Sequence, residues 1–202
     1  MIGIVKYGAG NIYSVFSALR YLGEEVISIE NPKILDRVNF LILPGVGNFA
    51  SSIENLEKMD LLEKIRYKIN EGIPFLGICL GLQLLFDWSE EGEKNGLGIL
   101  KGKVVRFKSR SIKIPHIGWN KVKILKESLL FKDIKDNSYF YFAHSYYVNT
   151  QKEFIIGKTN YGVDFPSVIL KENIVGTQFH PEKSGTVGLL FLKNFLEEKW
   201  LQ

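Results

Sequence analysis

Residues 74–86 read PFLGICLGLQLLF and contain the only cysteine among the 202 residues of the chain. The apolar residues 75–78 are typical of a buried strand, and residues 82–88 are expected to begin a helix. Between them, Cys79 lies in a Gly-x-Cys-x-Gly pattern. Such a pattern is typical of a nucleophile elbow, a tight strand-to-helix turn whose neighbouring side chains must be small.

The elbow context gives the thiol a chemical role to weigh against a structural one. A helix that begins after Cys79 directs its free N–H groups and positive dipole end at the sulfur, which favours the reactive thiolate. The backbone N–H of Leu80 is also placed to stabilise an oxyanion. The alternative is a buried cysteine among small packing residues, since free cysteine is among the most buried residue types. The elbow alone leaves both interpretations open.

A general base would favour the catalytic interpretation, and the chain has three histidines: His116, His144 and His180. His180 follows the expected strand 174–178, and the next residue, Pro181, disfavours helical backbone at His180. Glu182 can then lie near the imidazole ring or hold it through the turn, leaving the second ring nitrogen free to take the thiol proton. A surface loop with an unrelated His and Glu is the alternative. Together the three side chains predict acyl transfer through a thioester.

The order of the expected elements predicts an α/β fold. Strands are expected at 2–5, 26–29, 40–43 and 75–78, and helices after Asn11, a plausible N-cap, up to Gly23, and at 56–69. This alternation predicts a central, mostly parallel sheet with helices on both faces. The second half predicts antiparallel strand additions and a last helix near 187–200; the short strands are expected at 103–108, 121–124, 139–142, 154–158, 167–170 and 174–178.

Composition limits the protein class. Residues 1–202 are expected to form one domain in the cytoplasm, because one cysteine excludes a disulfide scaffold and the longest uncharged run is shorter than the roughly 20 residues of a membrane helix. A net charge of +4 does not by itself indicate nucleic acid. The three histidines and one cysteine suggest no metal cluster. A run of basic residues is expected to be a solvated strand face, and the alternative is a surface for an acidic partner. No aromatic platform for nucleic acid accompanies it. The run comprises Lys101, Lys103, Arg106, Lys108, Arg110 and Lys113.

Six stretches together resemble the class I glutamine amidotransferases, over nearly the whole chain, and within that family the glutaminase subunit that serves a cyclase in histidine biosynthesis. They are YGAGN (7–11), LPGVG (43–47), GICLGLQ (77–83), PHIGWN (115–120), AHSY (143–146) and QFHPEKS (178–184). The elbow and the His-Pro-Glu segment are shared across the family, whereas the first and fourth stretches distinguish this subunit. Lys6 departs from the acid that commonly precedes the first stretch, which puts any contact made by that side chain in doubt.

The resemblance implies a role for each site residue. Cys79 would attack the side-chain amide of L-glutamine, His180 would relay protons and Glu182 would orient His180. Val46 and Gly47 would belong to an oxyanion strand whose connecting peptide can rotate, although Pro and Gly also punctuate ordinary turns. The residues implied in glutamine binding are Gln83, Glu91, Ser145 and Tyr146, with Glu90 an adjacent competitor for Glu91; those implied in partner contact are Asn11, Trp119, Asn120 and Lys183.

The resemblance also implies a partner, a cyclase subunit with a (β/α)₈-barrel fold that receives ammonia, and it implies no cofactor or metal. Three alternatives stay open. The chain could be a paralogue that feeds a different synthase, a Cys-His-Glu hydrolase acting alone, or a non-catalytic binding subunit. Gln83, Glu91 and the partner stretches argue against the lone hydrolase, and the intact triad argues against a binding subunit.

Overall fold

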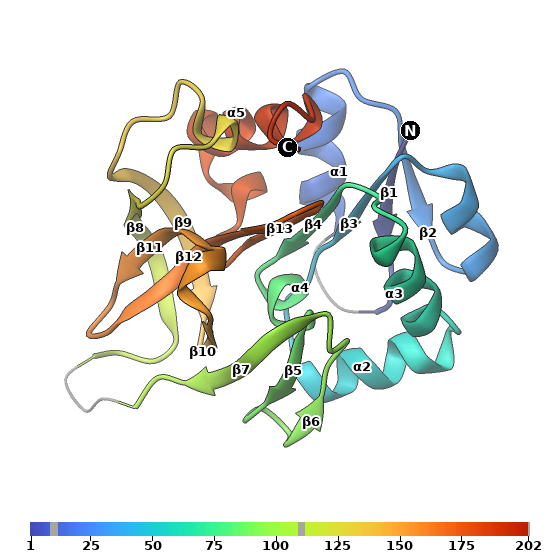
Figure 1. Cartoon of the computed structure of the whole chain (residues 1–202), viewed down its shortest axis with the longest axis horizontal. Coiled ribbons are helices and arrows are strands. Elements are labelled where there is room, and N and C mark those ends of the chain that lie inside the picture. Colours follow the sequence, from blue (N-terminus) through green and yellow to red (C-terminus); the bar gives the residue numbers. More distant parts are fainter. Residues whose placement is uncertain (9–11, 109–111, 202) are drawn as a thin grey trace.

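A nine-stranded sheet forms the centre of the protein, seen here in a computed structural model that describes residues 1–8, 12–108 and 112–201 (Figure 1). The strands lie in the order β2 (Val26–Ile29), β1 (Ile2–Val5), β3 (Phe40–Leu43), β4 (Phe75–Ile78), β13 (Ile174–Thr177), β12 (Asp164–Lys171), β11 (Ile155–Asn160), β8 (His116–Ile124) and β9 (Ser138–His144). The first five are parallel to one another, and the pairings from β13 to β9 are antiparallel. The predicted parallel sheet with antiparallel additions is confirmed.

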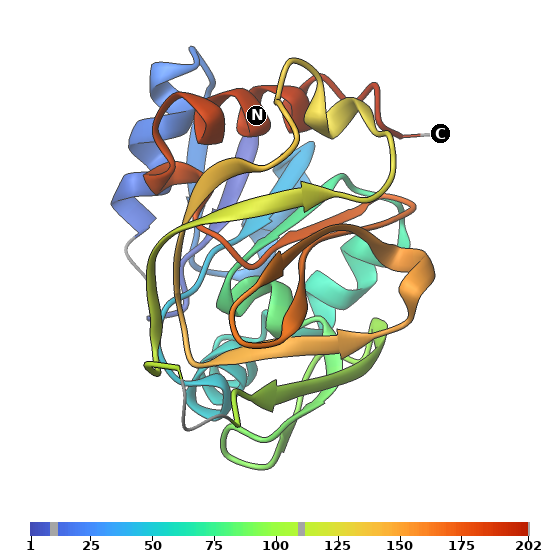
Figure 2. The ribbon, with the colours of Figure 1, turned by 90° about the vertical axis from the view of Figure 1, so that its left-hand side faces the viewer.

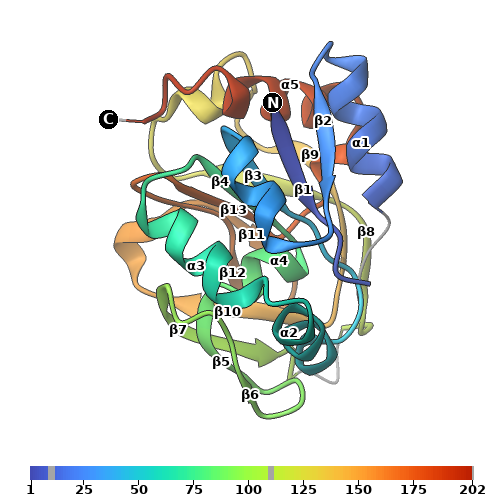
Figure 3. The same ribbon diagram turned by 90° about the vertical axis from the view of Figure 1, so that its right-hand side faces the viewer.

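Helices cover both faces of the sheet, as predicted. Helices α1 (Ile12–Tyr21) and α5 (Gly185–Leu196) pack on one face, and α2 (Phe49–Lys58) and α3 (Leu62–Asn70) lie on the other (Figures 1 and 3). The parallel strands supply both cores because successive side chains point to opposite faces. In β3, for example, Ile42 joins the cluster under α1 and α5, and Leu41 and Leu43 join the other.

A second, four-stranded sheet lies beside the α2 end of the molecule (Figure 1). Its order is β10 (Tyr146–Thr150), β7 (Leu100–Arg106), β5 (Phe86–Ser89) and β6 (Lys94–Asn95). The chain passes from the large sheet to the small one between β4 and β5 and again between β9 and β10 (Figure 2). A hydrogen bond from the Gln83 side chain to the Tyr146 carbonyl joins these two crossings. Short 3₁₀ turns complete the described elements: η1 (Pro32–Arg37), η2 (Leu129–Phe131), η3 (Lys152–Phe154) and η4 (Pro181–Lys183).

The prediction of a helix over residues 82–88 is wrong. The helix α4 (Leu80–Gln83) is a single turn, after which β5 pairs with β7. Tertiary hydrogen bonds compete successfully with helix propensity here, because the Leu84 carbonyl accepts from Leu97 N and the Leu85 carbonyl accepts from Ile99 N.

Two other predicted helices differ from the structure in where they begin, break or end. Residues 56–69 do not form one helix, because Asp60 adopts φ +55° and separates α2 from α3. Helix α2 begins earlier, where the Asn48 side chain accepts a hydrogen bond from Ser51 N. The last helix ends at Leu196, not near residue 200, and Trp200 instead packs on Phe195 with ring centroids 5.4 Å apart.

Much of the basic run is a solvated strand face, as expected. Lys101 pairs with Asp87 at 3.2 Å and Lys108 with Glu90 at 2.8 Å. Arg110 and the proposed N-cap Asn11 lie outside the described residues. Lys6, the departure noted above, forms an exposed ion pair with Glu30 at 2.8 Å. None of the helices in the described ranges is long and apolar enough to cross a bilayer.

Candidate active site

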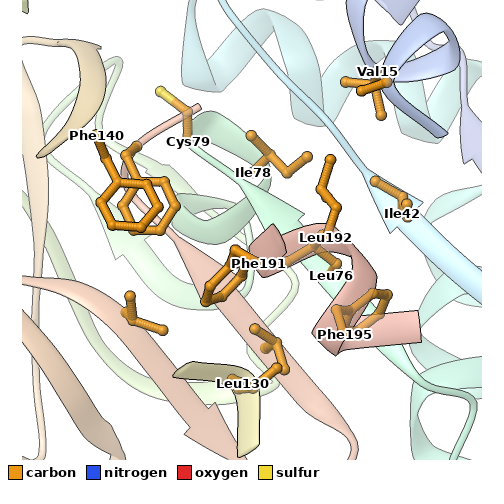
Figure 4. Close-up of a cluster of buried hydrophobic side chains, with 14 of the residues drawn as sticks. Val15, Ile42, Leu76, Ile78, Cys79, Leu130, Phe140, Phe191, Leu192 and Phe195 are labelled. Carbon is orange, nitrogen blue, oxygen red and sulfur yellow. The ribbon is translucent and has the colours of Figure 1, made fainter. Parts of the chain in front are cut away.

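Cys79 lies at the turn between β4 and α4, with φ +54° and ψ −104°. Few non-glycine residues adopt such backbone angles, and they cluster at functional sites. The flanking glycines are required by close backbone approach. A Cβ on Gly77 would lie 2.7 Å from the Gly81 carbonyl oxygen, and one on Gly81 would lie 1.7 Å from that of Leu43. The cysteine sits at the margin of the buried core beside Ile78 (Figure 4).

His180 and Glu182 form a buried pair at the end of β13. His180 Nδ1 lies 2.9 Å from Glu182 Oε1, and the two side chains are only 2% and 4% exposed. His180 itself is extended, and the η4 turn brings Glu182 back to the ring. The Tyr141 carbonyl accepts from His180 N, and Ser184 Oγ donates to the His180 carbonyl, so the backbone is held on both sides.

The electrostatics of this pair favour proton transfer. Burial alone would lower the pKa of His180, but the nearby Cys79 sulfur and then the Glu182 carboxylate raise it to about 10. With Glu182 on Nδ1, the other ring nitrogen carries the reactive lone pair when the ring is neutral. That atom, Nε2, is buried and has no hydrogen-bond partner among the described residues. The Cys79 sulfur also interacts with this ring, so the nucleophile and the base lie within reach of each other before substrate binds.

A pocket of about 190 Å³ opens over the cysteine. Besides Cys79, it is lined by every residue predicted for the oxyanion and glutamine sites: Val46, Gly47, Leu80, Gln83, Glu91, Ser145 and Tyr146. Four further lining residues were not predicted: Pro115, Ile117, Ala143 and His144. Of the two adjacent acids, only Glu91 lines the pocket. Glu90 instead bonds Lys108 and Arg106 N. Burial raises the pKa of Glu91, and a hydrogen bond from Phe49 N at 2.8 Å partly opposes this.

The junction between β9 and β10 forms one wall of the pocket. The Tyr146 carbonyl lies 2.9 Å from Gln83 Nε2 and 2.7 Å from His144 Nδ1, both of which donate to it. Phe107 N donates to the Ser145 carbonyl at 3.2 Å. The Tyr146 carbonyl thus accepts from two side chains that line the pocket, and the Ser145 carbonyl is bonded to the residue that follows β7.

One of the predicted oxyanion donors, the Leu80 N–H, is hydrogen-bonded within the protein. Leu80 N–H points at the Gly45 carbonyl, with a long N···O distance of 3.4 Å. Gly47 has φ +126° and open space at its Cβ position, so its constraint is conformational rather than steric. Val46 beside it is exposed.

Trp119 and Lys183, two of the four predicted partner residues, lie against Tyr141, whereas the side chain of Asn120, next to Trp119 on β8, points to the other face of the strand. Trp119 is 55% exposed, and its ring centroid is 6.2 Å from that of Tyr141. Lys183 Nζ lies 6.0 Å from the same Tyr141 ring. The Asn120 side chain donates to the Asn160 carbonyl at 3.0 Å. The fourth, Asn11, lies outside the described residues.

The other two histidines, His116 and His144, form a buried hydrogen-bonded network with Asn120. His116 Nδ1 and His144 Nε2 are 3.0 Å apart, and Asn120 Nδ2 is 3.3 Å from His116 Nε2. Burial lowers the pKa of His116 to about 4 and that of His144 to about 3, so both rings are neutral near pH 7. The sequence stretches PHIGWN and AHSY contain both residues, but their contact depends on the β8–β9 register, which spacing does not reveal.

No metal centre is found within the described ranges, where no three His, Cys, Asp or Glu side chains gather as ligands. The site also contains Gln178, which sequence reasoning did not single out. It is fully buried after β13 and contacts both Gln83 and Cys79.

Comparison with known proteins agrees with this geometry. The family "Glutamine amidotransferase class-I" matches residues 4–199. Two curated relatives named imidazole glycerol phosphate synthase subunit HisH are similar over nearly their whole length. The protein from Methanocaldococcus jannaschii is 53% identical, covering 98% of this chain and 99% of the relative. The protein from Caldanaerobacter subterraneus is 50% identical, covering 98% of each.

Solved structures share the fold at low sequence identity. The PurLQS structure from Thermotoga maritima has a TM-score of 0.75 at 19% identity, covering 97% of each chain. A crystal structure of a glutamine amidotransferase gives 0.76 at 18% identity, with the same coverage. These likenesses concern the fold alone, whereas the close relatives define the group. The chain belongs to the class-I glutamine amidotransferase family and, within it, to the HisH subunits of imidazole glycerol phosphate synthase.

Proposed function

We propose that this chain is the glutaminase subunit of an imidazole glycerol phosphate synthase, with Cys79, His180 and Glu182 as its catalytic residues. The observation that best supports this proposal is the buried His180–Glu182 pair, 2.9 Å apart, beside Cys79, which has strained backbone angles and lines a pocket. This arrangement has the three roles of a triad: nucleophile, base and orienting carboxylate. The substrate is L-glutamine, and no cofactor enters the reaction.

The reaction divides into two acyl transfers. The Cys79 sulfur, having given its proton to His180, attacks the side-chain amide carbon of glutamine. The C–N bond breaks, His180 returns the proton to the leaving nitrogen, and ammonia departs from a glutamyl thioester. Water then attacks the thioester, with His180 taking its proton and passing it to the departing sulfur. The free thiol and the γ-carboxylic acid of glutamate result, and this acid releases its proton to water or to the departed ammonia.

The pocket offers complementary groups for glutamine. A carboxylate at Glu91 would hold the α-ammonium group, since the substrate's positive charge favours the ionised form of this half-buried acid. Gln83 and the backbone groups of Ser145 and Tyr146 would hold the carboxylate and the amide. A stand-alone peptidase would need a cleft for an extended chain, and a 190 Å³ pocket suits a single amino acid better.

Rotation of the oxyanion strand would complete the site. Leu80 N–H is occupied by the Gly45 carbonyl at 3.4 Å, so a developing oxyanion would need this contact to be released. We infer that the Val46–Gly47 peptide rotates and couples partner occupancy to glutamine hydrolysis. The Gly47→Ala variant should lose most stimulation by the partner, because alanine disfavours φ +126°. Unchanged basal and stimulated rates would exclude this coupling.

The partner would be a cyclase subunit with a (β/α)₈-barrel fold. Its binding face would include Trp119 and Lys183, with Asn120 and Asn11 further candidates. Ammonia released into bulk water would be protonated and lose its nucleophilicity, which favours transfer through a closed interface. The cyclase would use it to form imidazole glycerol phosphate and an aminoimidazole carboxamide ribotide. We place this reaction in the cytoplasm and assign it to one domain over residues 1–202.

Glutamate release tests the proposal. The chain would be assayed alone and mixed with a histidine-pathway cyclase and its nucleotide ligand, with Cys79→Ala as the control. Activity that appears or rises sharply in the mixture, and is absent in the control, supports the proposal. Strong activity of the chain alone would favour an independent hydrolase, and no activity with that cyclase would favour a different synthase partner.

A further inference from the structure

The buried side chain of Gln178 contacts the nucleophile directly. Its Nε2 lies 3.6 Å from Cys79 Sγ, a hydrogen-bonding distance for sulfur, and the residue is fully buried. We infer that Gln178 is a further catalytic residue, whose side-chain N–H binds the Cys79 sulfur and stabilises its thiolate. The inference rests on the proposed role of Cys79 as nucleophile.

The orientation of the Gln178 amide follows from its neighbours. A carbonyl only accepts hydrogen bonds, so the Gln83 atom 2.9 Å from the Tyr146 oxygen must be nitrogen. The same Gln83 nitrogen lies 3.1 Å from Gln178, which must therefore present its oxygen there. The remaining amide atom of Gln178, directed at the sulfur, is then the NH₂ group. The orientation of the Gln178 amide therefore follows from the Tyr146 main-chain carbonyl and does not depend on how the oxygen and nitrogen of Gln178 were first assigned.

The backbone around Gln178 is fixed as well. Gln178 N donates to the Ser167 carbonyl at 3.0 Å, and Cys79 N donates to the Thr177 carbonyl at 2.7 Å. The strands that carry the two side chains are paired in parallel, with Thr177 opposite Ile78. The amide is therefore held in place before the sulfur ionises, which reduces the reorganisation that ionisation requires.

Ionisation of the thiol changes the balance of its contacts. The thiol proton can be donated to the Ala143 carbonyl, 3.8 Å from the sulfur. In the thiolate this oxygen faces a negative charge, which is unfavourable. The hydrogen bond from Gln178 strengthens at the same time, because bonds to charged acceptors are roughly twice as strong as neutral ones. Gln178 therefore compensates for the Ala143 oxygen without itself titrating, whereas His180 accepts and returns the proton.

The Gln178→Met variant tests the inference, because methionine has a similar length and no N–H donor. The readout is the pH profile of iodoacetamide alkylation of the full chain, in which the single cysteine is the only thiol. The midpoint should rise by about 1 pH unit, since one hydrogen bond to a charged group has about this effect. Gln178→Asn, whose shorter amide draws back from the sulfur, should give the same shift. Gln151→Met, at an exposed glutamine, is the matched control and should give none.

Other titratable groups stay constant in this comparison. His180 and Tyr7 act on the sulfur electrostatically, and Glu91 and His144 line the pocket with it. Circular dichroism would establish that each variant is folded. A midpoint unchanged from the parent chain in either folded Gln178 variant would overturn the inference. Alkylation needs no glutamine turnover, so an inactive parent chain would refute the proposed function and leave this test intact.

Discussion

Acidification from pH 7 to pH 5 should destabilise the protein through His144. The folded ring is neutral, with Nδ1 donating to the Tyr146 carbonyl at 2.7 Å and Nε2 lying 3.0 Å from His116. Burial lowers the pKa of His144 to about 3, whereas an unfolded histidine titrates at about 6.5. As the pH falls below 6.5, the unfolded chain binds a proton that the folded chain does not. At pH 5 this favours unfolding by RT ln(1 + 10^1.5), or about 2 kcal/mol.

Urea unfolding at pH 7 and pH 5 measures this effect in the parent chain and in His144→Gln. Between pH 7 and pH 5, the free energy of unfolding should fall by about 2 kcal/mol more in the parent than in the variant. Each protein is compared with itself, so the part of the packing cost that does not depend on pH cancels. His116 contacts His144, so both proteins are measured in a His116→Gln background, which removes the titration of His116. Losses equal to within about 0.5 kcal/mol would refute the reasoning, because the expected difference of about 2 kcal/mol is several times larger.

Three further predictions follow from particular contacts. Glu182→Gln keeps the size of the side chain but removes the charge that orients His180, so kcat for glutamate release should fall roughly 10²–10⁴-fold with little change in KM; an unchanged kcat would count against the triad. Asn194 is buried and donates to the Leu130 and Lys132 carbonyls at 3.1 and 2.8 Å. Its replacement by leucine should lower the free energy of unfolding by about 2–3 kcal/mol in urea titrations, whereas a loss below about 0.5 kcal/mol would mean that the two carbonyls find other partners. Trp119 is 55% exposed, so Trp119→Ala should leave the Tm nearly unchanged while raising the Kd for the partner subunit at least about tenfold by calorimetry. A lower Tm with unchanged affinity would show that Trp119 serves the fold instead.

The parts of the fold that the sequence predicted are those fixed by local constraints. The alternation of short apolar runs with helical periods identified the parallel strands, because such strands are buried on both faces and read as continuous apolar segments. The Gly-x-Cys-x-Gly pattern located the elbow, since two backbones approach there too closely for any Cβ.

The parts that the sequence did not predict depend on contacts between distant segments. Residues 82–88 were expected to continue as a helix, but Leu84 and Leu85 form a turn whose carbonyls accept from the chain beyond residue 96, and Phe86–Ser89 pairs with β7. The pocket likewise joins Glu91 to the β9–β10 junction, a meeting that no spacing rule reveals. Its oxyanion and glutamine residues were predicted, whereas Pro115, Ile117, Ala143 and His144 were not. Gln178 belongs to one of the six family stretches, but nothing in the sequence showed that its side chain reaches Cys79.

The close approach of Gly81 to Leu43 limits how sequences with this elbow can diverge. A Cβ at position 81 would lie 1.7 Å from a main-chain oxygen, so no change of side chain at position 43 makes room for one. No second side-chain substitution compensates for a mutation at this site, and a lineage can replace the glycine only by moving the backbones of β3 and α4 apart. Descendants that lost the cysteine and the amidase reaction should therefore still keep this glycine, as a trace of the ancestral turn after the chemistry has gone.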